Sequence, residues 1–331
     1  MSSTATIPNH SILQDGYGQA DLLRFAEAPT PTIAANEVLL RVHGAGLDRG
    51  TWHMMEGRPY LLRVIGFGLR KPKNQVPGID VAGIVVAVGR AVTRFAVGDE
   101  VYGIGRGSFA TFAAAREDKL ARKPANLSFA QAAVVPISAI VALQALTDVG
   151  RVQAGQHVLI TGASGGVGTY AVQLAKSLGA EVTGTCRATK VDLVRSLGAD
   201  HVIDYNRQDF AEGPARYDLI LDTGGNPTLA RLRRALTPAG TAVIIGGEEG
   251  GKWTGGFGRQ LRAAATSPFV RQRLVMFAAK ERGSDLERLT ELIEAGTLTP
   301  TLDKTFSLSR VPEAMHYLEA GKARGKVAIT I

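Results

Sequence analysis

Cysteine is almost missing from this sequence, because Cys186 is the only one among 331 residues. A single thiol excludes an intrachain disulfide and any zinc site that needs several cysteines. Long apolar runs are missing too, since no stretch comes near the ~18 residues that a membrane-spanning helix needs. The first ten residues contain neither a basic segment nor an apolar one, so no secretory signal is visible. With 45% hydrophobic and 21% charged residues, the composition is typical of a soluble globular protein, and a cytoplasmic location is expected.

Acidic residues are the minority charge: 30 aspartates and glutamates stand against 38 lysines and arginines, a formal net charge of +8. Such an excess is compatible with a nucleic-acid or membrane-surface partner. The densest basic groups, at residues 58–73 and 259–282, contain no RNA-binding motif. A solvated basic face that attracts a phosphorylated cofactor is therefore favoured over nucleic-acid binding, and stable membrane insertion is not expected.

Hydrophobic patterning divides the chain into a β-rich first part and a second part of alternating strands and helices. Up to about residue 125, strand patterns such as 37–43 and 80–88 are separated by turn glycines, including Gly103, which is typical of a barrel-like or sandwich-like domain. A helical stretch at 130–146 then precedes repeated βα units. Such units require a parallel sheet with helices on both faces, so the predicted fold class is α/β with a Rossmann doubly wound sheet. The predicted strands are 157–161, 181–185, 201–204, 217–222 and 241–246, and the predicted helices are 169–178, 189–197 and 227–236.

A glycine-rich turn follows the first strand of these units. It consists of Gly162, Ala163, Ser164, Gly165, Gly166, Val167 and Gly168. A strand that enters such a turn and then a helix points backbone N–H groups and the positive helix end at a diphosphate. The spacing G-x-x-G-x-x-G alone also fits other α/β proteins, and the place of the turn among βα units is what favours a dinucleotide.

The residues after the second strand indicate which dinucleotide is bound. NAD-binding units carry a carboxylate about 20 residues past the glycines, but this chain has none at 185–187. A carboxylate would repel a 2′-phosphate, whereas Arg187 and Lys190 can bind it, so NADP(H) is predicted, with ordinary surface charges as the alternative. Tyr205, after the third strand, is a candidate contact of the adenosine or a core-edge tyrosine. Gly246, at the end of the strand 241–246, is a further candidate cofactor contact.

Four motifs occur along the chain in a fixed order: Pro77-Gly-Ile-Asp-Val-Ala-Gly-Ile-Val85, Val97-Gly-Asp-Glu-Val-Tyr-Gly103, Leu159-Ile-Thr-Gly-Ala-Ser-Gly-Gly-Val-Gly168 and Leu197-Gly-Ala-Asp-His-Val-Ile-Asp-Tyr205. This series resembles the zinc-independent quinone oxidoreductase branch of the medium-chain dehydrogenase/reductase superfamily. The resemblance implies a GroES-like catalytic domain at 1–126, to which 296–331 returns, and a Rossmann NADP-binding domain at 127–295. It also implies an active site between the domains, a homodimer, and a phosphate contact from Lys326.

The resemblance also bears on zinc. Zinc alcohol dehydrogenases of this superfamily hold a catalytic metal on cysteines and a Gly-His-Glu turn, where this chain has Gly78-Ile79-Asp80 and no cysteine in the expected catalytic domain. Without thiolates or that imidazole a zinc Lewis acid cannot be assembled, so no metal site is predicted. The chemistry that remains is hydride delivery from NADPH to an electrophilic small molecule such as a quinone or an α,β-unsaturated carbonyl.

The candidate catalytic residues are Asp48 and Tyr60. Relatives often carry Asn-x-x-Asp-Trp where this chain has Asp48-Arg-Gly-Thr51-Trp52. An ionised Asp48 only accepts hydrogen bonds and would oppose a developing enolate unless it is protonated or paired with Arg49. Tyr60 is a candidate proton donor or pocket wall, with a packing aromatic as the alternative. The stretch 63–73 is interpreted as a mobile lid or pocket wall, and peripheral membrane contact is the lesser alternative.

Three functions remain open on the sequence. The first is the NADPH-dependent quinone or enone reductase. The second is an NADPH-binding sensor, structural protein or RNA-binding protein with little turnover. Asp48 and Thr51 keep this alternative open, as does Val141, which stands where relatives commonly have a threonine. The third is an alcohol dehydrogenase or an enoyl-thioester reductase.

Overall fold

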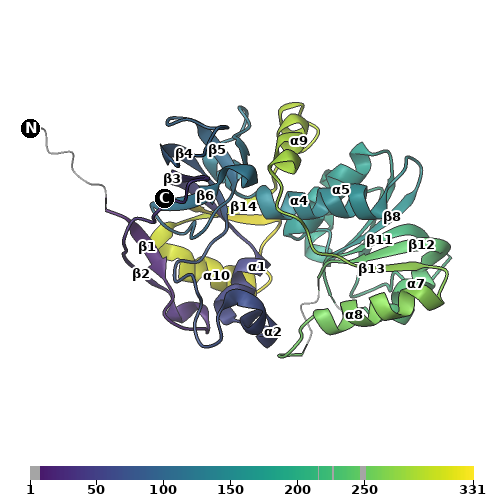
Figure 1. The fold of residues 1–331 in the computed structure, drawn as a ribbon. Helices are drawn as coiled ribbons and strands as arrows, with labels where there is room; N and C mark the ends of the chain where they lie inside the picture. Colours follow the sequence, from purple (N-terminus) through teal and green to yellow (C-terminus); the bar gives the residue numbers. More distant parts are fainter. Residues whose placement is uncertain (1–7, 215, 226, 247–250) are drawn as a thin grey trace, which may run out of the picture.

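The computed structural model describes residues 8–214, 216–225, 227–246 and 251–331. Its strands form two large sheets, one in each half of the molecule, and a small separate pair (Figure 1). The first large sheet has six parallel strands in the order β10-β9-β8-β11-β12-β13. This is the strand order of a Rossmann sheet, which confirms the predicted doubly wound fold. The strands are β8 (His157–Thr161), β9 (Glu181–Cys186), β10 (His201–Asp204), β11 (Tyr217–Asp222), β12 (Leu236–Ile244) and β13 (Arg273–Met276).

Helices cover both faces of this sheet because successive strand residues point to opposite sides. Val158 and Ile160 pack in one hydrophobic cluster with α4 (Pro136–Gln144) and α5 (Gly166–Ser177), whereas Leu159 packs on the other side with α7 (Leu229–Ala235) and α8 (Phe257–Thr266). Figure 1 shows these two pairs of helices on opposite sides of the sheet. The short helix α6 (Val191–Ser196) follows β9, and α9 (Gly283–Glu294) packs on the α4 side.

The second large sheet has the order β14-β15-β3-β4-β5-β7, with β6 also paired to β3. β15, the last strand in the sequence, lies antiparallel to β3, so the C-terminal segment returns to the β-rich first part of the chain. The strands are β3 (Glu37–Leu47), β4 (Asp80–Val88), β5 (Glu100–Ile104), β6 (Phe112–Arg116), β7 (Leu120–Arg122), β14 (Leu302–Ser307) and β15 (Lys326–Thr330). The return of β14 and β15 agrees with the split domain that was expected, while the boundaries at 126 and 295 stay predictions.

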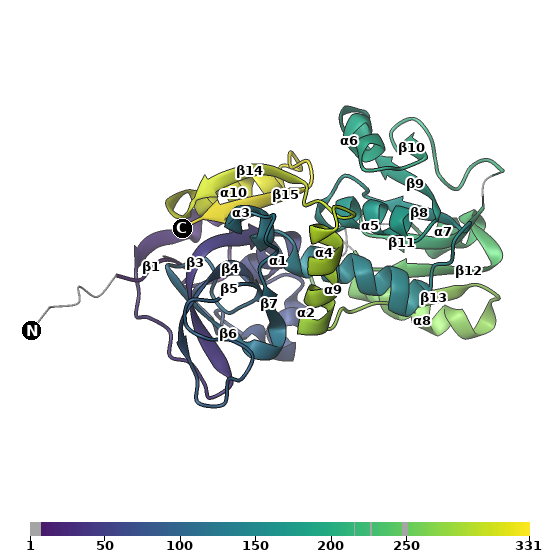
Figure 2. The same cartoon turned by 90° about the horizontal axis from the view of Figure 1, so that it is seen from above.

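Short elements complete this half of the molecule. The separate pair is β1 (His10–Leu13) with β2 (Arg24–Glu27), and the helices are α1 (Arg49–Glu56), α2 (Tyr60–Leu62), α3 (Phe129–Ala133) and α10 (Val311–Glu319). Figure 2 shows α4 and α9 between the two sheets. There Tyr102 of β5 donates a hydrogen bond to the Leu286 carbonyl of α9 at 2.8 Å, which ties the two halves together.

The structure differs from the sequence predictions in some details. The helical stretch predicted at 130–146 is divided into α3 and α4, because Pro136 has no N–H to donate and starts a new helix, and α4 continues into a π-helical segment at Ala145–Gly150. Gly103 was predicted to mark a turn but lies inside β5, which was missed. The glycine-rich stretch 250–259 begins outside the described residues. In the part of the chain that is described, no helix combines the length and apolar character needed to cross a membrane.

Candidate functional site

The glycine-rich turn leads from the end of β8 directly into α5. Gly162 has a φ of +65°, and the Gly165 N–H bonds the Gly162 carbonyl at 2.9 Å, so the chain folds back tightly. Gly165 is the N-cap of α5 and provides no side-chain acceptor, which leaves the N–H groups of the first helical turn available. A Cβ on Gly165 would touch only the Gly162 carbonyl oxygen, at 3.2 Å, among the protein atoms nearby. The turn is therefore a cradle of backbone N–H groups at a helix N-terminus, which fits a diphosphate.

The other residues of the turn have structural tasks. A Cβ on Gly168 would stand 2.2 Å from the Gly162 carbonyl oxygen, so only glycine lets α5 approach β8 this closely. Ala163 is fully buried, and its N–H donates to the Thr185 carbonyl at 3.0 Å. The Ser164 carbonyl accepts from the Gly325 N–H at 3.0 Å, which links the turn to the segment before β15. Val167 packs against the core of the sheet. Ala163 and Val167 thus shape the cradle through packing, and their direct cofactor contact stays a prediction.

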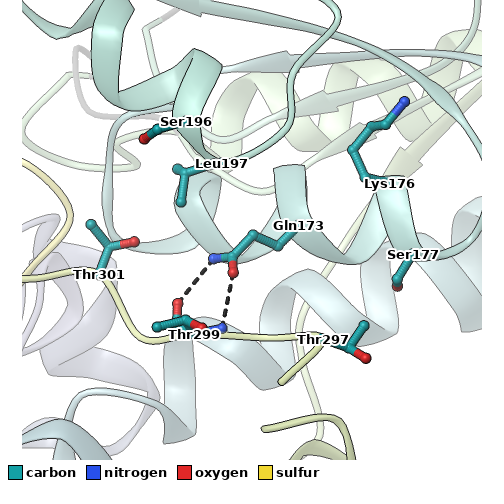
Figure 3. A pocket seen from close by; sticks show the side chains of 8 residues that line it. All are labelled: Gln173, Lys176, Ser177, Ser196, Leu197, Thr297, Thr299 and Thr301. Carbon is teal, nitrogen blue, oxygen red and sulfur yellow. Dashed lines mark hydrogen bonds between the residues drawn. The ribbon is translucent and has the colours of Figure 1, made fainter. Parts of the chain in front are cut away.

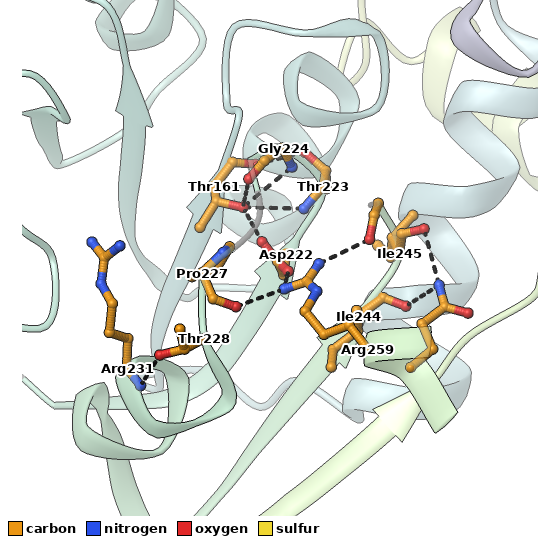
Figure 4. Close-up of polar contacts among 12 residues, drawn as sticks. Thr161, Asp222, Thr223, Gly224, Pro227, Thr228, Arg231, Ile244, Ile245 and Arg259 are labelled. Atoms are coloured by element: carbon orange, nitrogen blue, oxygen red, sulfur yellow. Dashed lines mark hydrogen bonds and ion pairs between the residues drawn. The ribbon is translucent and has the colours of Figure 1, made fainter. Parts of the chain in front are cut away.

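A buried ion pair lies at the carboxyl edge of the sheet, next to this turn (Figure 4). Asp222, the last residue of β11, is fully buried and lies 2.5 Å from the guanidinium of Arg259 on α8. The Thr161 hydroxyl donates to Asp222 at 2.8 Å. Arg259 also donates to the carbonyls of Pro227 (3.1 Å) and Gly246 (2.9 Å). Burial raises the pKa of Asp222, and the Arg259 charge opposes that effect. The pair fixes the ends of β8, β11 and β12 at the switch point where dinucleotides bind.

Gly246 is at this edge for a packing reason. A Cβ there would stand 2.6 Å from the Thr223 carbonyl oxygen, so a larger residue would push β12 and β11 apart. Backbone contact explains why residue 246 is a glycine, and its predicted contact with the cofactor stays a prediction.

Arg187 and Tyr205 are brought together at the outer end of the site. Arg187 follows β9, Tyr205 follows β10, and the Arg187 Nε donates to the Tyr205 hydroxyl at 2.7 Å. Both side chains are exposed. This bond uses Nε, so it leaves the two terminal nitrogens of the Arg187 guanidinium for other partners. Arg187 and Tyr205 therefore form a cationic, hydrogen-bonding group at the position where a NAD-binding protein needs a carboxylate.

Lys190 has a different environment from the one predicted for it. Its ammonium donates to the carbonyls of Gly321 (3.1 Å) and Ala323 (2.6 Å), which precede β15. Burial, together with the neighbouring Arg187 charge, lowers the pKa of Lys190. Nearby, Arg324 donates to the Thr189 carbonyl at 2.7 Å and pairs with Asp192 at 2.6 Å. Lys190 thus joins the two halves of the molecule, and a 2′-phosphate contact from it remains a prediction.

Lys326 is buried beside the glycine-rich turn. Its ammonium donates to the Ser138 hydroxyl of α4 at 2.9 Å and lies 3.7 Å from the Asp80 carboxylate of β4. Its Cδ lies 3.0 Å from where a Cβ on Gly166 would be, which places the chain against the first turn of α5. Lys326 thus lies against the turn, and its ammonium already donates to Ser138 beside Asp80. A direct phosphate contact stays a prediction.

The burial of Asp80 predicts a loss of stability as the pH rises. Burial, opposed by the Lys326 charge, raises the pKa of Asp80 from 3.8 to about 8. The folded state then holds a proton that the unfolded state has lost above its own pKa, so the free energy of unfolding falls with rising pH until Asp80 ionises. When the pH is raised from about 6 to about 8, we expect the free energy of unfolding, measured with urea, to fall by about 1 to 2 kcal/mol more in the wild type than in Asp80→Asn. An equal pH dependence in both proteins would contradict this assignment.

Asp48 is the N-cap of α1. Its Oδ1 accepts from the Thr51 N–H at 2.7 Å, while its Oδ2 is buried without a hydrogen-bond partner among the described residues. The Arg49 guanidinium lies over the Trp52 ring at 5.3 Å. Oδ1 of Asp48 thus caps the N-terminus of α1, and this structural role explains an aspartate at position 48. Its catalytic role stays a prediction.

Tyr60 lies where the two halves of the chain meet. Its ring makes an edge-to-face contact with Trp253 at 5.4 Å, and the Arg63 guanidinium lies over it at 4.7 Å. The Tyr60 N–H donates to the Lys252 carbonyl at 2.9 Å, and the Leu61 N–H donates to the Trp253 carbonyl at 3.0 Å. Tyr60 is therefore at the junction that was expected to hold the acceptor, half-buried and held by its backbone.

Two surface cavities lie away from these residues. One, of about 430 Å³, lies between α5 and the segment that leads to β14, where Gln173 exchanges two hydrogen bonds with the Thr299 backbone (Figure 3). The other is lined by Arg216, Arg233 and Phe269 among others. Neither contains a predicted site residue, so we assign the candidate site from the turn and its neighbours. Over residues 8–331, the gaps excepted, no group of three or more His, Cys, Asp or Glu side chains is placed to bind a metal ion.

Sequence reasoning missed Asp222 and Arg259 as parts of the site. Asp222 carried a signal, because it directly follows the apolar residues 219–221 at the end of the predicted strand 217–222. Arg259 carried none, since it is one of several arginines in a basic stretch and only the fold brings it to Asp222. Ser138 and Asp80 were similarly unrecognised as partners of Lys326.

The molecule combines a Rossmann sheet, which has a glycine cradle at its switch point, with a β-rich sheet that the C-terminus completes. This combination defines a nucleotide-dependent oxidoreductase. Comparison with known proteins agrees with this class. Residues 34–125 match the alcohol dehydrogenase GroES-like domain, which confirms the predicted GroES-like part, and residues 197–329 match a zinc-binding dehydrogenase domain. The chain belongs to the medium-chain dehydrogenase/reductase family, in its quinone oxidoreductase-like branch.

Individual relatives cover nearly the whole chain. A chloroplastic quinone oxidoreductase of Triphysaria versicolor is 34% identical over 96% of this chain and 97% of its own length. The chloroplastic NADPH-dependent alkenal/one oxidoreductase of Arabidopsis thaliana is 33% identical over 99% of this chain and 82% of its own. The solved quinone oxidoreductase of Coxiella burnetii superposes with a TM-score of 0.87 at 26% identity, covering 98% of this chain and 100% of that one.

Proposed function

We propose that this protein is an NADPH-dependent reductase that delivers hydride to a quinone or an α,β-unsaturated carbonyl without a zinc ion. The observation that carries the proposal is the pair Arg187 and Tyr205, which stands beyond the glycine cradle where a NAD-binding protein needs a carboxylate. The names of the relatives, a quinone oxidoreductase and an NADPH-dependent alkenal/one oxidoreductase, support the cofactor and the acceptor class. The absence of cysteine outside Cys186 supports a reaction without zinc.

Each group of residues at the site has its own proposed role. When bound, NADPH supplies the hydride from its nicotinamide. The backbone N–H groups at the start of α5 would hold the diphosphate, and Arg187 with Tyr205 would hold the 2′-phosphate. Quinones and enones accept hydride without a metal because the negative charge moves to a carbonyl oxygen, which a single donor stabilises. Tyr60 is the proposed donor, and Asp48 is the proposed second group near the acceptor.

Four further features belong to the same proposal. The catalytic domain comprises 1–126 with 296–331, and the NADP-binding domain comprises 127–295. The protein acts in the cytoplasm and forms a homodimer.

Turnover with a panel of acceptors tests the function. Purified protein and NADPH are mixed with quinones, enones and aldehydes, and the loss of reduced-nicotinamide absorbance is followed. We expect turnover with quinones or enones and far slower reaction with saturated aldehydes. Tight NADPH binding without turnover on any acceptor would refute the reductase and favour the binding protein instead.

Cofactor preference tests the role of Arg187. Removing a charge-assisted contact costs about 1.5 to 3 kcal/mol, so Arg187→Ala should weaken NADPH binding about 10- to 100-fold. NADH binding should be unchanged, because NADH has no 2′-phosphate. Arg195→Ala, which removes an exposed arginine from α6, is the matched control and should change neither affinity. An equal loss for both cofactors in Arg187→Ala would contradict the proposed 2′-phosphate site.

A protein with little turnover is the second candidate, and the commitment of Asp48 to capping α1 favours it. Asp48→Asn separates the two candidates, since asparagine caps a helix as well as aspartate and also provides an amide donor. We expect the melting temperature to stay the same and kcat/KM for an enone to rise about two- to tenfold, the value of one hydrogen bond. A fall in kcat/KM would show that the carboxylate itself is required.

A further inference from the structure

We propose that one face of this protein, next to the junction that holds Tyr60, binds the anionic surface of a phospholipid membrane. The proposal concerns a basic-apolar patch. The patch consists of the exposed side chains of Val64, Phe67, Leu69 and Trp253 together with those of Arg58, Arg70, Lys71, Lys73 and Lys252.

Charge distribution along the sequence is the first observation. No aspartate or glutamate occurs between residues 57 and 79, nor between residues 250 and 280. Both stretches are rich in lysine and arginine. Glu248 and Glu249 precede the second stretch and lie outside the described residues. Other stretches, such as 149–180, also lack an acidic residue, so the two stretches matter for the cations that they expose, which are Arg58, Arg70, Lys71, Lys73 and Lys252.

The fold places these two stretches against each other. The backbone hydrogen bonds from Tyr60 to Lys252 and from Leu61 to Trp253 join them, and a Cβ on Gly255 would lie 3.0 Å from the Pro59 ring. Figure 1 shows the segment before α8 reaching toward α2. The fold thereby brings Lys252 and Trp253 of the second stretch beside the basic first stretch.

A chain of contacts connects the two segments that carry the patch. Trp253 packs on Tyr60, the Arg63 guanidinium lies between the rings of Tyr60 and Tyr17, and the Tyr17 hydroxyl donates to the carbonyls of Phe67 (3.0 Å) and Gly68 (2.7 Å). The backbone that presents the exposed apolar side chains is therefore anchored.

The apolar side chains of the patch are unusually exposed. Trp253 is 73% exposed, Leu69 70% and Val64 67%. Large apolar side chains that cluster on a surface mark an interaction site, whereas single ones are ordinary. Among the described residues, none of the five cations of the patch has a carboxylate partner, whereas Arg24, Arg94 and Arg116 elsewhere on the surface each do.

An anionic bilayer surface is the partner that matches both properties. Unpaired lysines and arginines are attracted to anionic headgroups, and aliphatic side chains with a tryptophan enter the region between headgroups and acyl chains. A single-stranded nucleic acid would need a row of stacking aromatics, but Val64 and Leu69 offer no ring for a base. If the proposed function holds, a hydrophobic quinone could pass from the membrane to the site next to Tyr60.

Vesicle binding by the full chain tests the patch without any cofactor or acceptor, so its outcome is independent of the proposed function. Trp52 and Trp253 are the only tryptophans, and Trp52→Phe makes Trp253 the sole fluorescent reporter. With vesicles of phosphatidylcholine and phosphatidylglycerol we expect cosedimentation and a blue shift of Trp253 emission. Vesicles of phosphatidylcholine alone should bind at least about tenfold more weakly, since each cation near the surface contributes roughly fivefold.

Charge reversal at two positions provides the matched comparison. Lys71→Glu with Lys73→Glu should weaken binding to the anionic vesicles at least tenfold. Arg90→Glu with Arg195→Glu removes the same net charge from exposed positions elsewhere and should leave binding within about twofold. Equal loss in both double variants, absence of vesicle binding, or a Trp253 emission that does not shift would overturn the proposal. Binding of single-stranded RNA without vesicle binding would assign the patch to nucleic acid instead.

Discussion

Replacing Gly165 with valine should weaken NADPH binding at least about 100-fold and leave the free energy of unfolding within about 1 kcal/mol of the wild type. Gly165 has extended backbone angles that valine adopts readily, with φ −89° and ψ 179°. A Cβ there meets only the Gly162 carbonyl oxygen, at 3.2 Å, so the added methyl groups would enter the open space that we propose for the diphosphate. Isothermal titration with NADPH and urea unfolding measure the two effects.

Gly168→Val is the matched comparison, because it lies in the same turn but faces the protein. Its Cβ would stand 2.2 Å from the Gly162 carbonyl oxygen and 2.7 Å from the Ala163 Cα, both backbone atoms that cannot move aside. We therefore expect this variant to lose stability as well as binding. If Gly165→Val bound NADPH normally, the cradle would not be the diphosphate site.

Arg259→Met should destabilise the fold by about 3 to 5 kcal/mol, which is the usual result of leaving a buried charge without its partner. Arg259 is almost fully buried, lies 2.5 Å from Asp222, and also holds the carbonyls of Pro227 and Gly246. Removing it leaves Asp222 desolvated and two carbonyls without a donor. Thermal and urea unfolding measure the loss.

The double variant identifies the cause. Asp222→Asn alone leaves a buried guanidinium and should also cost about 3 kcal/mol or more. Combining Asp222→Asn with Arg259→Met removes both charges, so the total should be well below the sum of the single losses. Strict additivity would show that the two residues act separately and that the ion pair does not hold the edge of the sheet.

The Rossmann half of the fold could be predicted from the sequence because its signals are local. The inner strands β8 and β11 are buried on both faces and contain a short apolar run. Four of the five predicted strands, 157–161, 181–185, 201–204 and 217–222, match the structure within one residue. The strand predicted at 241–246 overlaps β12, 236–244, which begins five residues earlier and ends two residues sooner. The β-rich half was harder, since the short strand β5 contains Gly103, a residue type that is typical of turns.

The parts of the site that depend on distant contacts could not be predicted. Lys190 looked like a phosphate ligand because it stands near Arg187 in sequence, but its ammonium is held by carbonyls of residues 321 and 323. The phosphate contact of Lys326 stays a prediction, and nothing in the sequence indicated that Ser138 and Asp80 lie beside its ammonium. Local patterns identify the cradle, whereas the partners of a buried charge come from other elements and appear only in the folded chain.

Direct hydride transfer is the central claim, and an isotope measurement tests it most directly. NADPH carrying deuterium at the nicotinamide C4, prepared separately for each of the two faces, is incubated with the protein and an enone. The account predicts a reduced ketone with one deuterium on its β-carbon, from one of the two labelled cofactors only. A product without deuterium from either cofactor, or no product while NADPH is bound, would contradict it.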